Sequence, residues 1–301
     1  VDGAETGADN AKCTVIGTSY AEGSGSPDVW SEELDNDYGY TQIFKTACEM
    51  SNTARATRYR GYADEWQRIW NLKLREHKID IERAMLFGQR ASQSGIQYSE
   101  GISGHIIKNG TAVVDDSALS YSSGAPYFRS SATSELTYDR LLSDFEVVYD
   151  PARGGSQSKL ALASLPVITF FNKLGADFFV NRSMVAGTSS TVNDVSNLRY
   201  NMSEKEGSFG HKVMMVDTIH GSMALVKEPL FRGFASGFLQ LVDLDHVSYR
   251  PLVGNGVNRD THIITNVQSS DEDLRKDMIL TEAGLEVSLP ETHYLLHLEG
   301  V

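Results

Sequence analysis

Residue types that bind metal ions gather near the end of the sequence. His293, His297 and Glu299 would share one face of a strand, because side chains alternate along a strand. Two imidazoles and one carboxylate can hold a transition metal. A metal site also needs a rigid frame, which a chain end rarely supplies. We therefore expect satisfied or exposed histidines here, and no metal ion.

Two pairs of nearby carboxylates could serve acid–base catalysis or bind a cation. They are Asp115–Asp116 and Asp243-x-Asp245. Closely spaced acids in loops are more often only solvated. The sequence contains neither a Gly-x-Ser-x-Gly nucleophile elbow nor a phosphate-binding loop ending in Gly-Lys-Ser/Thr. We expect no catalytic residue, no cofactor and no enzymatic activity.

Two segments of opposite charge give a stronger signal. Residues 1–37 contain nine acids and one lysine, a net of −8, whereas residues 45–90 contain ten basic and six acidic residues, a net of +4. The acidic segment is either a solvated tail or an arm that docks on another subunit. The basic segment includes Arg55, Arg58 and Arg60, which either lie on a solvated face or pair with such an arm in another chain.

The whole composition bounds the class of protein. The 301 residues are 41% hydrophobic and 22% charged, which is ordinary for a globular chain. The net charge of −13 argues against general affinity for nucleic acid, although it does not exclude a container around DNA. Two cysteines give no disulfide framework, and no apolar run is long enough to span a membrane. No signal peptide is visible, and a chain that starts at Val1 has either lost a leader or begins upstream.

The strongest predicted element is a helix over Tyr62–Gln89. Apolar residues and one histidine recur there at helical spacing: Trp66, Trp70, Leu74, His77, Ile81 and Met85. We expect both tryptophans to lie in the core. A helix of this length is about 40 Å long and suggests a subunit built to touch its neighbours.

The remaining pattern predicts a mixed α+β protein. Further helices are expected over Tyr138–Tyr149 and from Ser164 to an exit at Gly175. Residues 40–59 are expected to be extended. The other expected strands are His105–Ile107, Lys159–Ala163, a hairpin of Lys212–Ile219 and Ser222–Lys227, Leu239–Val242, Val247–Arg250, Met278–Thr281 and Leu285–Leu289.

The order of several motifs resembles the major capsid proteins of tailed bacteriophages with the Hong Kong ninety-seven fold. The resemblance covers roughly residues 38–301. It rests on the segments Tyr40–Phe44, Ser51–Ala54, Gly61–Trp66, Lys78–Leu86, Gly221–Val226, Leu241–Asp245, Tyr249–Leu252, Glu282–Val287 and His293–Leu296.

The resemblance implies an assignment of each segment. Residues 1–36 would be an N-terminal arm and 37–61 an extended loop that reaches over an adjacent subunit. Residues 62–134 would be the peripheral domain with its spine helix (62–89), 135–240 the axial domain, and 241–301 returning peripheral strands. The contacts between subunits would involve Lys45, Arg55, Arg58 and Arg60 on the loop and Glu32, Glu33, Asp35 and Asp37 on or beside the arm.

The same resemblance implies a function. Many copies would assemble into capsomers and an icosahedral shell around double-stranded phage DNA, without a cofactor, a membrane or sequence-specific DNA binding. Scaffolding, portal and cement proteins would be the other partners. The protein would reside in the virion after assembly in the host cytoplasm.

Three alternatives remain. An encapsulin-like nanocompartment shell would share the fold but package enzymes. A soluble hydrolase would use His293 or the Asp243/Asp245 pair. A virion decoration protein would usually be all-β, which the three expected helices disfavour.

Overall fold

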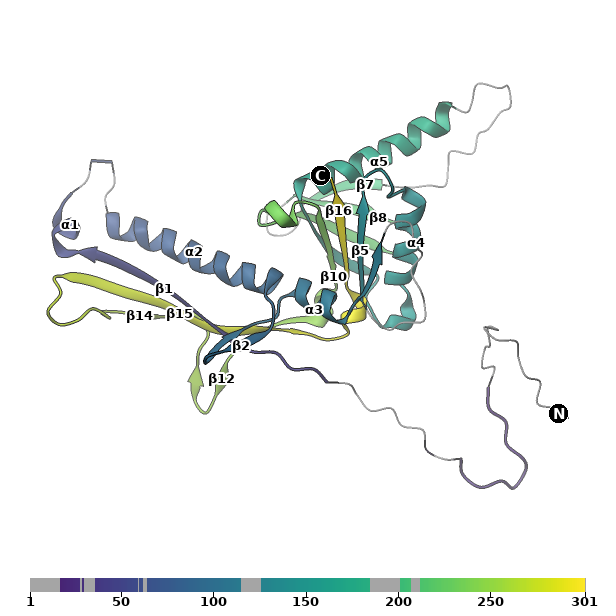
Figure 1. The fold of residues 1–301 in the computed structure, drawn as a ribbon, viewed down its shortest axis with the longest axis horizontal. Coiled ribbons are helices and arrows are strands. Elements are labelled where there is room, and N and C mark those ends of the chain that lie inside the picture. The colour runs from purple at the N-terminus through teal and green to yellow at the C-terminus, as the bar shows by residue number, and fades with distance from the viewer. Residues whose placement is uncertain are drawn as a thin grey trace. The chain divides into compact units, whose positions relative to one another are not determined.

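The computed structural model divides the chain into two units. The first is Val1–Tyr38 and the second is Gly39–Val301. The structure describes residues 17–27, 29, 36–58, 60–61, 64–114, 126–184, 201–206 and 212–300. In the first unit, residues 22–23 form a turn, in which Ser24 N donates a hydrogen bond to the Ala21 carbonyl oxygen. The second unit contains two large sheets and the longer helices (Figure 1).

The first large sheet has four strands built around β15 (Leu274–Val287). β1 (Gln42–Ser51) pairs antiparallel with it on one side, and β11 (Val247–Pro251) and β14 (His262–Ile264) pair with it on the other. The sequence predicts two separate strands within 278–289, but the structure has one continuous strand. Gly284 does not mark a turn. It allows the Tyr40 carbonyl to approach closely, since a Cβ there would lie 2.9 Å from that oxygen.

Helix α2 (Glu65–Phe87) confirms the predicted long helix with slightly shorter bounds. Asp64 caps its N-terminus by accepting a hydrogen bond from Gln67 N, and Gly88 caps its other end. The buried His77 bridges α2 to the four-stranded sheet. Its Nδ1 lies 2.9 Å from Thr46 Oγ1 of β1, and its Nε2 lies 2.8 Å from Thr281 Oγ1 of β15. The helix thus covers one face of this sheet.

Short elements surround α2 at both ends. The helix α1 (Asn52–Ala56) follows β1, in a stretch predicted to be extended. The strands β2 (Ala91–Gln93) and β3 (Ile96–Tyr98) form a hairpin. The helix α3 (Ile102–Asn109) replaces the predicted strand 105–107, because Ile102 and Ile106 are both buried at helical spacing.

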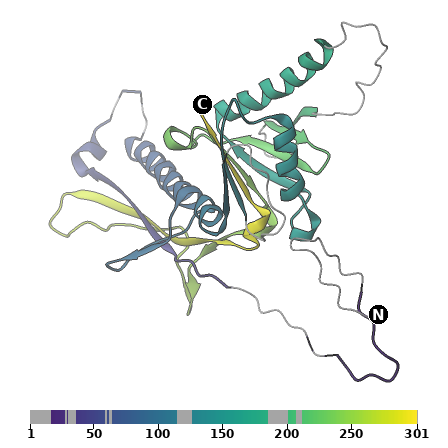
Figure 2. The same ribbon diagram turned by 45° about the vertical axis from the view of Figure 1, so that its right-hand side comes forward.

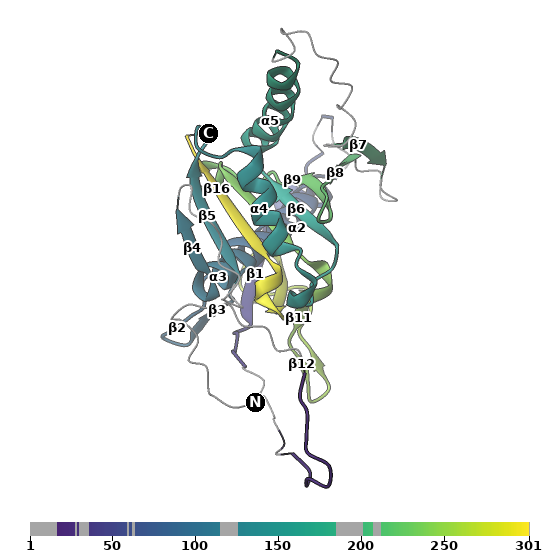
Figure 3. The same cartoon turned by 90° about the vertical axis from the view of Figure 1, so that its right-hand side faces the viewer.

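The second large sheet has eight strands in the order β4-β5-β16-β10-β6-β9-β8-β7. Figure 3 shows this sheet with helices in front of it. The strands are β4 (Thr111–Val114), β5 (Tyr127–Ala132), β6 (Ser158–Ala163), β7 (Asn201–Glu206), β8 (Lys212–Asp217), β9 (Ser222–Lys227), β10 (Phe238–Val242) and β16 (Tyr294–Glu299). The predicted hairpin of β8 and β9 and the predicted strands β6 and β10 are confirmed.

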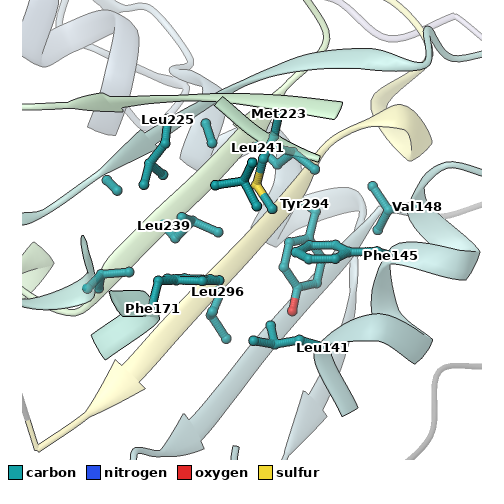
Figure 4. Close-up of a cluster of buried hydrophobic side chains, with 14 of the residues drawn as sticks. Leu141, Phe145, Val148, Phe171, Met223, Leu225, Leu239, Leu241, Tyr294 and Leu296 are labelled. Atoms are coloured by element: carbon teal, nitrogen blue, oxygen red, sulfur yellow. The ribbon is translucent and has the colours of Figure 1, made fainter. Parts of the chain in front are cut away.

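Helices α4 (Tyr138–Val148) and α5 (Leu165–Met184) pack on one face of the eight-stranded sheet. The predicted α4 is confirmed, whereas α5 continues past Gly175, where the sequence predicts its end. Their apolar side chains meet those of the strands in a large buried cluster (Figure 4). Its members include Leu141, Phe145, Val148, Val167, Phe171, Met223, Leu225, Leu239, Leu241, Tyr294 and Leu296.

A second buried cluster covers the opposite face of the same sheet. It joins the end of α2 and helix α3 to the strands, through Leu86, Ile102, Ile106, Phe231, Ala235, Phe238, Val242 and Leu295. Along β16, Leu295 belongs to this cluster while Tyr294 and Leu296 belong to the other. The alternation shows that the central strands of the eight-stranded sheet are buried on both faces.

The remaining described elements are short. The strands β12 (Val253–Gly254) and β13 (Val257–Asn258) form a hairpin whose turn holds Asn255 and Gly256 at positive φ, as Asn-Gly turns require. The 3-10 turns in the described part of the chain are η1 (Pro151–Arg153), η3 (Gly233–Ala235), η4 (Leu244–His246) and η5 (Pro290–Thr292). Within the described residues, no helix is both long and apolar enough to cross a membrane.

The sheets divide the chain differently from the segments that the resemblance implies. Residues 62–134 and 241–301 were assigned to the peripheral domain. However, β4, β5, β10 and β16 pair within the eight-stranded sheet, together with the strands of residues 135–240. The chain therefore passes from one sheet to the other at three places: before β4, between β10 and β11, and between β15 and β16.

Candidate subunit interface

The basic segment begins in β1, a strand that is hydrogen-bonded to β15 of the same chain. β1 pairs with β15 over its whole length, so residues 42–51 of the predicted extended loop lie on their own subunit. Beyond it, Asn52 N donates to the Asp273 carbonyl oxygen at 3.3 Å, and Asn52 Nδ2 donates to the Asp273 carboxylate. Whether this segment reaches over an adjacent subunit stays a prediction.

Arg55 lies against its own subunit. Its guanidinium donates to Asn52 Oδ1 at 3.1 Å and lies 6.0 Å from the ring centre of Trp66. Arg275 lies 4.9 Å from the same ring, and Trp66 stacks on Trp70 at 6.4 Å. The structure therefore gives Arg55 a place in a cation–aromatic cluster at the N-terminal end of α2.

The two tryptophans are only partly buried. Trp66 and Trp70 belong to neither buried cluster, so the prediction that they lie in the core is wrong. The physical reason is their position in the first turns of α2, where the cover comes from arginines rather than from a second layer. Partly exposed Trp and Arg are the residue types that often dominate binding at protein interfaces.

Arg58 and Arg60 are exposed in the turn between α1 and α2. Lys45 is exposed on the face of β1 that points away from α2, since Phe44 and Cys48 are buried on the other face. The structure thus places the basic candidates on two separate surfaces. One is the segment that follows β1 (residues 52–58 and 60–61), which we call the tip, and the other is the outer face of β1. They do not form one cluster with each other.

The acidic candidates belong to the other unit or its border. Glu32, Glu33 and Asp35 lie outside the described residues. Asp37 is exposed, and its carboxylate accepts a hydrogen bond from Tyr38 N at 2.8 Å. Their pairing with the basic residues stays a prediction.

The residues considered for metal binding have local structural partners. His293 is fully buried and its Nδ1 accepts a hydrogen bond from Asp243 N at 3.1 Å. His297 Nδ1 lies 3.3 Å from Ser130 Oγ, which also donates to Glu299 at 2.7 Å. Among the residues that the structure describes, no three His, Cys, Asp or Glu side chains are grouped to hold a metal ion.

Asp243 is a structural carboxylate. It accepts hydrogen bonds from Ser156 N, Asp245 N and the buried Lys159 ammonium, the last at 3.1 Å. Burial alone would raise the pKa of Asp243, but these donors hold it below its usual value. Burial lowers the pKa of Lys159 despite this partner. Asp115 and Asp116 lie outside the described residues.

The same cluster makes His293 a buried neutral imidazole. Burial, with the nearby Lys159 charge, lowers the pKa of His293 to about 4. Its Nε2 has no hydrogen-bond partner in the described structure. The group is enclosed and neutral at physiological pH, which suits a packing role and gives a substrate no access.

Sequence reasoning missed another exposed surface. Residues 252–267 flank β15 and carry six exposed aliphatic side chains. A signal was present in the sequence, because positions 251–270 contain only two charged residues, Arg259 and Asp260, in a chain with 67 acidic and basic residues.

Comparison with known families gives one match over nearly the whole chain. The model of the family described as SU10 major capsid protein matches residues 6–299. No curated protein sequence matches the chain.

Solved structures share the fold at low sequence identity. A chain of the bacteriophage PhiM1 mature capsid is 10% identical, with a TM-score of 0.51 and coverage of 96% of this chain and 80% of that one. A chain of the satellite phage P4 procapsid is 12% identical, covers 96% and 80%, and has a TM-score of 0.49. The encapsulin from Synechococcus elongatus PCC 7942 is 13% identical, covers 85% and 73%, and scores 0.48. At such identities the likeness concerns the fold alone, and scores below 0.5 add nothing to the argument.

Proposed function

Because the chain belongs to the SU10 major capsid protein family, we propose that its acidic arm pairs with the basic tip of a neighbouring copy in the capsid shell. The chain is a major capsid protein with the predicted Hong Kong ninety-seven fold, and many copies of it form the shell of a bacteriophage particle. The opposite charges of residues 1–37 and 45–90 support the pairing, since they orient two copies relative to each other.

Exposure supports a division of roles among the basic residues. Arg58 and Arg60 are exposed at the tip and are the principal partners of Glu32, Glu33, Asp35 and Asp37. Arg55 acts indirectly, because its contacts with Asn52 and Trp66 brace the tip. Lys45, on the outer face of β1, adds a separate contact.

The segment assignment is proposed with the sheets as a guide. Residues 1–36 are the arm and 37–61 the loop, of which only the part beyond β1 reaches outward. The four-stranded sheet with α2 forms the peripheral domain. The eight-stranded sheet with α4 and α5 corresponds to the axial domain and extends beyond 135–240 at both ends.

The further partners are part of the same proposal. The shell encloses double-stranded DNA without sequence-specific contacts, which the net charge of −13 supports. Scaffolding, portal and cement proteins join it, and assembly takes place in the host cytoplasm. The protein has no enzymatic activity of its own. The two hydrolase candidates Asp243 and His293 support this, because both are buried among structural partners.

Charge reversal tests the pairing. The double variant Arg58→Glu/Arg60→Glu should reduce the fraction of protein in shells, measured by sedimentation velocity and negative-stain microscopy. A second set of reversals, Glu32→Lys, Glu33→Lys, Asp35→Lys and Asp37→Lys, should restore assembly in the first variant. The matched control is Arg232→Glu, an exposed arginine on the eight-stranded side. Normal assembly of the double variant, or a loss that the arm reversals do not repair, contradicts the pairing.

Cargo separates this function from the nanocompartment alternative. Shells purified from a host should contain genome-length DNA and tail-joining proteins. A packaged enzyme with a docking peptide would instead identify a nanocompartment.

A further inference from the structure

The outer flank of the four-stranded sheet is a distinct surface, which we call the rim and define as residues 252–267. It consists of the β12–β13 hairpin, the connecting segment and β14 (Figure 1). Figure 2 shows the hairpin leaving the sheet at the β15 strand. β14 pairs with β15 along one edge, and no described strand pairs with its other edge. An open strand edge is a place where another chain can bind.

The rim is apolar where it meets solvent. Val253 is 60% exposed, Val257 56% and Ile263 53%. The other exposed aliphatic residues of the rim are Leu252, Ile264 and Val267. Single exposed aliphatic residues are common, but six of them within sixteen positions indicate a surface that another molecule covers.

The rim also carries almost no free charge. Arg259 forms an ion pair with the Glu282 carboxylate of β15. The Asp260 carboxylate accepts hydrogen bonds from Tyr249 Oη at 3.0 Å and Thr261 N at 2.7 Å. Both charges of the rim are thus already engaged within the chain. Depletion of free charge is typical of the central part of a protein interface.

Backbone hydrogen bonds hold the rim in place. Leu252 N donates to the Glu282 carbonyl oxygen at 3.0 Å, and Glu282 N donates to that of Arg259 at 2.9 Å, so the base of the hairpin is fixed to β15. Farther along, Val267 N donates to the Lys276 carbonyl oxygen at 2.8 Å. A surface fixed in advance loses little conformational entropy when it binds.

We propose that the rim is a contact surface between copies of this chain in the shell, and that its occupant is a second copy. The proposal rests on the shell-forming function of the family. Two copies with a net charge of −13 each repel one another, so their closest contacts are most favourable where neither adds free charge. A basic partner would instead be drawn to the acidic parts of the surface. The rim therefore fits a neighbour that has the same net charge as this chain and an apolar surface at the contact.

Insertion of one charge into the rim tests the proposal. Val257→Asp and Val253→Asp, each made in the full chain, should lower the fraction of protein in shells by more than about tenfold, because a carboxylate would lose water without gaining a partner. Sedimentation velocity and negative-stain microscopy measure this fraction. Val257→Ile is the matched control and should assemble as the unchanged chain does.

Folding must be followed in the same samples. Both valines are largely exposed, so the circular dichroism and the unfolding midpoint of unassembled Val257→Asp should equal those of the unchanged subunit. Val253→Asp provides a second, independent reading if Val257→Asp lowers that midpoint.

The outcomes separate the rim from the function of the protein. If the unchanged chain forms shells and both folded aspartate variants form them equally well, the rim is no contact between copies, although the protein remains a shell former. If the aspartate variants form shells that only fail to bind an accessory protein, the occupant is not a second copy and the proposal is wrong. A chain that forms no shells even without substitution overturns the rim contact together with the function on which it rests.

Discussion

The two large sheets of the second unit differ in how much of their surface is buried. The central strands of the eight-stranded sheet are buried on both faces, and β10 is buried along its entire length. The four-stranded sheet is covered by α2 on one face only. On its other face Ile43 is 49% exposed, and Lys45 and Ala47 are exposed; the exposed rim flanks the opposite edge of β15. The eight-stranded sheet buries its core within one chain, whereas the four-stranded sheet leaves apolar side chains exposed.

Among the described ion pairs, those with both partners fully buried follow the same division. Asp277 and Glu282 of the four-stranded sheet are buried but pair with partly exposed arginines. In the eight-stranded part, the Arg129 guanidinium donates two hydrogen bonds to Asp144, which also accepts one from Tyr294 Oη at 2.8 Å. All three side chains are fully buried. Burial alone would lower the pKa of Arg129, but the Asp144 carboxylate keeps it above its usual value. In the four-stranded part, the ion pair between Arg250 and Glu286 lies in solvent.

The largest expected effect comes from the buried network. Asp144→Asn leaves the guanidinium of Arg129 buried without a counter-charge, so the free energy of unfolding should fall by about 3–5 kcal/mol. Denaturant unfolding of the unassembled subunit measures it. Glu146→Ala, at an exposed position on the same helix, is the control and should change little. A loss below about 1 kcal/mol would show that water reaches Arg129. The eight-stranded part would then differ less from the four-stranded part in the burial of its charges.

The elements with strong local signals could be predicted from sequence. Helices α2 and α4 and the β8–β9 hairpin are confirmed because apolar spacing, caps and turn residues all favour the same structure there. The misplaced elements are those where tertiary contacts decide. His105–Ile107 has the composition of a strand, yet Ile106 packs beneath the sheet as part of a helix. Gly284 looks like a break but serves a close backbone approach.

The candidate interface could be predicted only in outline. Charge counting finds the basic segment, but it cannot show that Arg275 joins Arg55 on the Trp66 ring or that β1 pairs with its own chain, because both depend on the distant β15. The family resemblance, which rests on the order of motifs, is confirmed by the family match. The rim escaped notice because exposed valines and isoleucines in strands look in sequence like any buried sheet.

A smaller effect is expected from pH at the buried histidine. In the unfolded chain His293 binds a proton below its ordinary pKa of 6.5, whereas in the folded protein its pKa is about 4. The unfolded state therefore holds more protons between these values, and stability falls as pH drops through this window, by about 3 kcal/mol in total. The charged and titratable groups around it are Lys159, Asp243, His246 and His105.

Substitution isolates this contribution. His293→Gln should flatten the fall in unfolding free energy between pH 6.5 and pH 4. His220→Gln, in the turn after β8, is the control and should leave the slope unchanged. If the slope of His293→Gln equals that of the unchanged protein, His293 is not enclosed and the closed character of this region is overstated.

The smallest effect is expected at the exposed ion pair of the four-stranded sheet. The side chains of Arg250 and Glu286 are 65% and 50% exposed, so water and salt screen their attraction. Glu286→Gln should leave the unfolding midpoint of the unassembled subunit unchanged at both low and high salt. The same variant should then be compared within assembled shells, by thermal melting at low salt. Unchanged melting there would place this pair outside any contact, whereas a loss confined to shells would extend the surface between copies from the rim to β11. A loss in the unassembled subunit would contradict the comparison, because it would mean that the four-stranded sheet depends on its charges as the eight-stranded sheet does.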